Sequence, residues 1–162
     1  MNEVVITRLV RARQWKVFKA WTSDKLFAGW WGANDVVNSL CKIDATRGGE
    51  IFVDMKLPDG KHYIMKGNFH LIDDPEQLIF TTNFFQNDEE HPTVKLLNTV
   101  IFLPENYNTR ITLQSVVMHT KADTQISIEQ LEQWWNESLD KLEHLMKLLR
   151  FSCFSIAHKT DK

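Results

Sequence analysis

The stretch that decides the fold lies near the N-terminus and reads ITRLVRARQWKVFKAWTSDKLFAGWWG, from Ile6 to Gly32. Its first part is rich in β-branched and apolar residues, which favours a strand over Glu3–Val10. The middle repeats apolar residues at helical spacing, as Trp15 and Phe18 show. The sequence therefore predicts a strand that is followed at once by a short helix.

The end of the same stretch predicts a second, very short helix. Residues Thr22–Asp24 supply N-cap chemistry, and Gly32 is a natural C-terminal stop. Helical spacing turns the adjacent side chains of Trp30 and Trp31 onto two adjoining faces. One tryptophan can then fix the short helix to the domain while the other borders the interior, and either residue can take either role.

From Val36 to about Met118 the pattern changes to strands and turns. Apolar residues alternate at period two, and the alternation places Leu71 in phase with Phe69 on the inner face. Turn signals such as Pro58–Gly60 recur at hairpin spacing. These segments are expected to form an antiparallel meander.

The last segment predicts one long amphipathic helix over about residues 125–150, since apolar residues recur there at steps of three and four. Ser127 and Gln130 have the spacing of a capping box. We expect one domain over residues 1–150 and a tail over 151–162 that extends the helix or frays. An apolar sheet face needs a cover, and this helix is the available one. The predicted fold is α+β, with a curved antiparallel sheet wrapped around one C-terminal helix and two short helices after the first strand.

Composition excludes several classes of function. The formal net charge is −2 and there is no long basic run, which gives no support to nucleic-acid binding. The N-terminus does not have the pattern of a signal peptide, and no apolar run is long enough to span a bilayer. Cys41 and Cys153 are far apart and form no CxxC motif. We therefore expect a cytoplasmic protein without disulfide, metal site or cofactor, and without a membrane partner.

A series of short motifs occurs in a fixed order along the chain. They are Thr7–Arg8, Val17–Phe18, Ala20–Trp21–Thr22, Trp30–Trp31–Gly32, Gly48–Gly49, Asp54–Met55, Pro58–Asp59–Gly60, Gly67 with Phe69, Asp73–Thr81, Thr109–Leu113 and Trp135–Leu145. Their order resembles the START-like (SRPBCC, birch-pollen-allergen-like) superfamily. More narrowly, it is similar to the family named after the C-terminal domain of the activator of the heat-shock protein 90 ATPase. The resemblance spans about residues 6–148 and implies a helix-grip fold with a cavity between sheet and helix.

The chain departs from this family at two positions. Trp134 stands where members usually have a small residue, often glycine, and Leu71 stands where many have an acidic one. If both side chains point inward, they make any cavity narrower or more apolar than is usual in the family.

The candidate ligand site consists of aromatic, methionine and leucine side chains that are expected to face the space under the long helix. They are Trp30, Trp31, Met55, Met65, Phe69, Phe80, Phe84, Met118, Trp135, Leu139 and Leu142. One interpretation is that they are simply the core of a helix-on-sheet domain. The other, which the resemblance favours for the set as a whole, is that some of them line a cavity for an apolar or aromatic molecule.

Three functions compete. The first, which we favour, is non-catalytic binding of an apolar or aromatic small molecule by a carrier, sensor or sequestering protein, as a monomer or homodimer. The second is a START-like enzyme of the polyketide cyclase or hydrolase type, although no catalytic motif or nucleophile–base pair is visible. Its polar candidates are Tyr63, His70, Asn98, Gln114 and Ser138. The third is a chaperone ATPase regulator, but the eukaryotic activators carry an additional N-terminal domain and this chain starts at the first strand.

Overall fold

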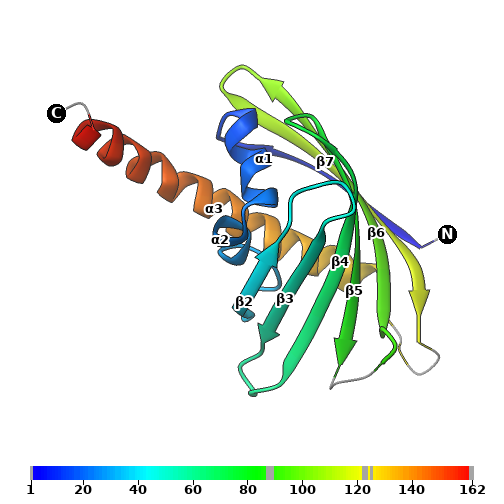
Figure 1. Ribbon diagram of the computed structural model, residues 1–162. Coiled ribbons are helices and arrows are strands. Elements are labelled where there is room, and N and C mark those ends of the chain that lie inside the picture. Colours follow the sequence, from blue (N-terminus) through cyan, green and yellow to red (C-terminus); the bar gives the residue numbers. More distant parts are fainter. Residues whose placement is uncertain (1, 87–89, 122–123, 125, 161–162) are drawn as a thin grey trace.

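A computed structural model describes residues 2–86, 90–121, 124 and 126–160, with side chains up to residue 150 (Figure 1). Seven strands and three helices follow one another along this part of the chain. In chain order they are β1 (Glu3–Val10), α1 (Gln14–Thr22), α2 (Asp24–Ala28), β2 (Val37–Ile43), β3 (Glu50–Lys56), β4 (His62–Asp73), β5 (Gln77–Gln86), β6 (Val94–Glu105), β7 (Asn108–Thr120) and α3 (Ile128–Thr160). The predicted α+β order is therefore present.

The strands form one antiparallel sheet in the order β1-β7-β6-β5-β4-β3-β2. Neighbours in this sheet are also neighbours in the chain, except that β1 pairs with β7. The sheet curves around α3, α1 and α2 lie on the same side as α3, and the C-terminal part of α3 projects beyond the sheet (Figure 1). This is the predicted helix-grip arrangement, in which the inner face of the sheet and one face of α3 enclose the core.

Two β-bulges correct the predicted inner face. In β4 the register passes from the pair Phe69–Phe80 to the pair Leu71–Ile79, so one residue is inserted between them. Because a bulge reverses the alternation, Leu71 points outward and is 36% exposed. The expectation that Leu71 faces the interior is wrong.

The second bulge concerns a predicted ligand-site residue. In β7 the register passes from the pair Leu96–Val117 to the pair Lys95–His119, and Met118 is the inserted residue. Its side chain is 56% exposed. The prediction that Met118 faces the interior is therefore wrong, because the bulge breaks the alternation of the strand at this residue.

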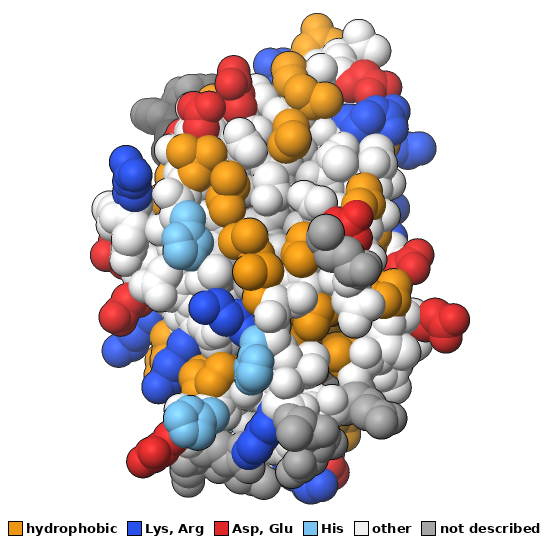
Figure 2. Space-filling view, turned by 90° about the vertical axis from the view of Figure 1, so that its right-hand side faces the viewer, with side chains coloured by type: hydrophobic (Ala, Val, Ile, Leu, Met, Phe, Trp, Pro, Cys, Tyr) orange, Lys and Arg blue, Asp and Glu red, His pale blue; other side chains and the backbone are white. Residues whose placement is uncertain are grey.

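Figure 2 views the outer face of the sheet, where exposed hydrophobic side chains lie among polar and charged ones. The exposed hydrophobic residues of the molecule include Val5 on β1 and Ile101 and Leu103 on β6. Apolar atoms make up a large part of any protein surface, so these residues need no special explanation.

Candidate functional site

Between the sheet and α3 lies an aromatic cluster, which we define as Trp21, Phe27, Trp30, Trp31, Phe80, Trp134 and Trp135. Its rings contact one another directly. The centroid of Trp135 lies 5.3 Å from that of Trp31 and 6.2 Å from that of Trp21. The centroid of Phe80, on the sheet, is 6.2 Å from Trp21. The rings thus occupy space that the sequence alone leaves available to a ligand.

The structure assigns separate roles to the adjacent tryptophans. Trp30 donates a hydrogen bond of 2.9 Å from its indole Nε1 to the carbonyl oxygen of Ala20 in the last turn of α1. That carbonyl belongs to the helix end, where no intrahelical donor is available. Trp31 instead packs edge-to-face against Trp134 and Trp135 of α3. Trp30 therefore fixes the short helices to each other, and Trp31 borders the interior.

The loop after this pair is held by α3. The helix α2 ends at Ala28, earlier than predicted, and Gly32 adopts a positive φ of 95° that favours glycine. Ser138 donates a hydrogen bond of 2.9 Å to the carbonyl oxygen of Gly32, and Lys141 donates one of 2.9 Å to that of Ala33. Burial lowers the pKa of Lys141, while the charge of Glu137 acts in the opposite direction. Polar side chains of α3 thus fix the position of Trp31.

Three buried indole groups have no acceptor. The Nε1 atoms of Trp21, Trp31 and Trp135 find no hydrogen-bond partner among the described residues. A buried donor without a partner costs free energy. The edge-to-face contacts of these rings place electropositive edges near π faces, which offsets part of that cost. The aromatic cluster is therefore stabilised by packing, and Trp30 is its one member with an indole hydrogen bond to the backbone among the residues described.

A short polar ladder crosses the inner face of the sheet. Asn98 on β6 donates a hydrogen bond of 3.1 Å to the hydroxyl of Thr82 on β5, and its amide oxygen accepts one of 2.7 Å from Ser115 on β7. All three residues are fully buried. Each side chain thus has a partner within the ladder, as buried polar groups normally do.

The polar residues considered for catalysis do not converge. Asn98 belongs to the ladder, and Ser138 is bonded to backbone carbonyls. His70 and Gln114 are exposed, and Tyr63 is half-buried with its hydroxyl 3.4 Å from the Gln86 amide nitrogen. These five residues therefore form no nucleophile–base pair with one another.

Neither thiol chemistry nor metal binding finds support among the described residues. Burial, with the charge of Asp24, raises the pKa of the Cys41 thiol to about 12, so this thiol stays protonated at neutral pH and is a poor nucleophile. Cys153 lies outside the residues with described side chains. In the described part of the chain, no group of three or more His, Cys, Asp or Glu residues is placed to hold a metal ion.

An apolar pocket of about 340 Å³ lies where the N-terminal end of α3 meets β5 and β6. We call it the apolar pocket; its walls are Phe84, Val94, Leu96, Ile126, Gln130, Leu131 and Trp134. The predicted capping box closes the helix end beside it, since Ser127 and Gln130 exchange two hydrogen bonds of 3.0 Å. Gln130 is the one polar side chain in this wall, and its amide oxygen is engaged in the cap.

Most predicted site residues lie elsewhere in the core. Buried among the core residues are Trp30, Trp31, Met55, Met65, Phe69, Phe80, Trp135, Leu139 and Leu142. Of the eleven predicted residues, Phe84 alone lines the apolar pocket. Sequence reasoning missed the contributions of β6 and of the segment before α3. The unusual tryptophan at position 134 was a usable signal, because its ring packs against Phe84 at 5.8 Å.

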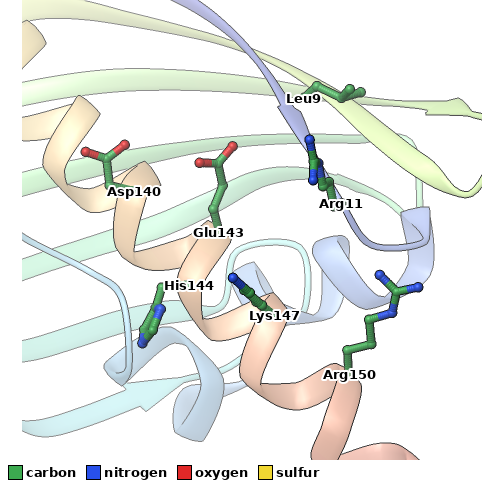
Figure 3. Close-up of a pocket in the computed structure, with 7 residues that line it drawn as sticks. All are labelled: Leu9, Arg11, Asp140, Glu143, His144, Lys147 and Arg150. Carbon is green, nitrogen blue, oxygen red and sulfur yellow. The ribbon is translucent and has the colours of Figure 1, made fainter.

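A second, charged groove of about 610 Å³ runs between β1 and α3 (Figure 3). Its walls are Leu9, Arg11, Asp140, Glu143, His144, Lys147 and Arg150. Next to it, Arg8 pairs with Asp140 and lies 3.7 Å from a Glu143 oxygen. Burial raises the pKa of Glu143, and the Arg8 charge opposes this shift. The groove thus has paired charges at one end, and Arg11 and Arg150 lie at the other (Figure 3).

Comparison with known proteins agrees with this fold. The model of the family described as "Activator of Hsp90 ATPase homolog 1-like protein" matches residues 11–147. The chain belongs to this family. No curated protein sequence matches the chain significantly.

Several solved structures have the same fold as this chain. Protein CV1439 from Chromobacterium violaceum superposes with a TM-score of 0.78 at 20% identity, over 90% of this chain and 96% of that one. A protein from Staphylococcus epidermidis gives 0.74 at 25% identity, over 91% and 90% of the two chains. The AHSA1-like protein from Aeromonas hydrophila gives 0.70 at 19% identity, over 91% and 93%. Among the described residues, no helix has the apolar length that a bilayer span requires.

Proposed function

We propose that the protein binds a small apolar or aromatic molecule in the apolar pocket and acts without catalysis, as a carrier, sensor or sequestering protein. The observation that carries this proposal is a pocket of about 340 Å³ with mostly aliphatic and aromatic walls. Ligand pockets of proteins have volumes of ~300–1,000 Å³ and are mainly apolar with few polar groups. The size and the chemistry of the walls therefore both fit a small hydrophobic ligand.

The packing of the core supports this location. The aromatic cluster already fills the space beneath α3, so we assign the ligand to the end of that space, where Trp134 and Phe84 form one wall. An aromatic ligand can stack on the Trp134 ring, which is only half-buried. We also propose that the protein is cytoplasmic, because its two cysteines show no disulfide pattern.

The test is a titration with N-phenyl-1-naphthylamine, an uncharged probe whose fluorescence rises in apolar surroundings. Ile126→Trp adds bulk to the wall of the apolar pocket and is expected to abolish the rise. Val37→Trp makes the same change at an exposed position on β2 and should bind the probe like the parent protein. Both variants are first compared with the parent protein by circular dichroism.

A second variant tests whether the probe stacks on the Trp134 ring, independently of whether the pocket is filled by a bulkier side chain. Trp134→Ala enlarges the pocket and removes its aromatic face, so the probe should bind at least about tenfold more weakly, which corresponds to ~1.4 kcal/mol. An unchanged dissociation constant in both Ile126→Trp and Trp134→Ala would show that the probe binds elsewhere and would overturn the proposal.

A further inference from the structure

A small pocket of about 230 Å³ lies at the opposite end of the molecule, where the turn between β1 and α1 meets the β6–β7 hairpin and α3. We call it the basic pocket. Its walls are Arg11, Ala12, Arg13, Lys16, Tyr107, Asn108, Met146 and Arg150. Four of these side chains are cationic and none is acidic. Ala12 and the buried Met146 form its apolar part.

The four cations form no ion pair with the residues that the structure describes. Arg8 and Arg110, by contrast, form ion pairs with Asp140 and Glu105. Within the described residues, no ion pair or hydrogen bond is made by the side chains of the four cations of the basic pocket. The Glu143 carboxylate interacts electrostatically with Arg11, but it lines the neighbouring groove and forms its ion pair with Arg8. The basic pocket therefore gathers four cations that no ion pair neutralises among the described residues, in a chain whose net charge is −2.

Helix α1 adds to this charge. Its N-cap residue is Arg13, Lys16 lies in its first turn, and that turn has no acidic residue. The N-terminal end of a helix carries a partial positive charge, so cations there are unfavourable and an anion is favourable. Mutual repulsion among four cations opposes the same folded arrangement. A bound anion would relieve both effects.

Aromatic rings hold two of the cations in place. The guanidinium carbon of Arg13 lies 4.9 Å from the ring centroid of Tyr107, and the ammonium of Lys16 lies 5.5 Å from that of Trp15. Cation–π contacts of this kind orient a charged group without neutralising it. Arg11 comes from the end of β1 and Arg150 from α3, so they form opposite walls (Figure 3).

We propose that the basic pocket binds the phosphate group of a small organic phosphate or of a phospholipid headgroup. Arginine donates to phosphate oxygens through its planar guanidinium, and lysine provides a point charge. The volume suits one phosphate with a short organic group, and Met146 with Ala12 offers that group an apolar contact. This inference does not depend on the proposed function, because the two pockets share no wall residue.

The first test is isothermal titration of the protein with inorganic phosphate and with pyrophosphate at low salt. The double variant Arg11→Gln/Arg150→Gln should bind at least about tenfold more weakly than the parent protein, since charge-assisted hydrogen bonds are lost. The control Lys42→Gln/Arg47→Gln removes the same charge from exposed positions near β2 and should bind like the parent. Circular dichroism confirms that both variants are folded.

A second arm distinguishes the source of the phosphate. Sedimentation with phosphatidylcholine vesicles, with and without added phosphatidic acid, is compared for the same variants. Binding of the free anions alone assigns a soluble phosphate, and binding of the phosphatidic acid vesicles alone, lost in Arg11→Gln/Arg150→Gln, assigns a lipid headgroup. Binding of neither probe, or equal weakening in the control variant, overturns the proposal.

Discussion

The two ends of α3 differ in what they offer to other molecules. Near Leu131 and Trp134 the helix contributes to an uncharged pocket that lies beside its N-terminal capping box. Near Lys147 and Arg150 it contributes to charged grooves whose cations are largely unpaired. One amphipathic helix thus borders two surfaces of different chemistry, because its buried face continues while its neighbours change.

The largest effect on stability is expected in the aromatic cluster beneath α3. Trp135→Ala should lower the free energy of unfolding by roughly 3–5 kcal/mol, because the fully buried ring contacts Trp21 and Trp31. Urea denaturation measures it. Trp134→Ala, which truncates the half-buried neighbour, should cost distinctly less. Equal costs would show that the half-buried Trp134 contributes as much to the stability of the core as the fully buried Trp135.

The next effect separates the adjacent tryptophans. Trp30→Phe removes the donor for the Ala20 carbonyl, whereas Trp31→Phe removes an indole N–H that has no partner among the described residues. We therefore expect Trp30→Phe to cost about 1–2 kcal/mol more than Trp31→Phe in thermal or urea unfolding. If the Trp31 variant is the less stable one, the two roles are reversed.

A smaller effect tests the charged end. Arg8→Gln breaks the contacts with Asp140 and Glu143 and should lower stability by about 1 kcal/mol. Arg150→Gln should be neutral or stabilising by a few tenths of a kcal/mol at low salt, because it removes repulsion from an unpaired cation. Added salt should shrink the second effect. A destabilising Arg150→Gln would mean that this cation is already compensated in the folded protein.

The smallest effect on stability is expected at Met118, which lies outside the buried core. Met118→Glu should change stability by less than about 0.5 kcal/mol, because the bulge leaves this side chain exposed. Met65→Glu places the same charge at a fully buried methionine and should prevent folding or cost several kcal/mol. The two variants are compared by urea denaturation. A large loss of unfolding free energy in Met118→Glu would show that the Met118 side chain is buried.

Much of the fold could be predicted from local patterns. The strand at Glu3–Val10, the two short helices, the hairpins and the capping box of Ser127 with Gln130 all depend on residues close together in the chain. Periodicity errs where a bulge inserts one residue, as beside Leu71 and at Met118. Bulges depend on cross-strand partners, which the alternation of one strand does not contain.

The sequence by itself determined the α+β order and the apolar character of the interior, because these depend on local propensity and periodicity. Its ordered motifs also carried the resemblance to the family. Only the tertiary structure decided which apolar residues pack against each other and which leave a pocket, since filling depends on the shapes of side chains from several elements. It also gathered Arg11, Arg13, Lys16 and Arg150 into one place. The sequence does not predict that pocket from a basic run, because Arg150 is separated from the other three cations by almost the whole chain. Arg150 comes close to them only when α3 packs across the sheet.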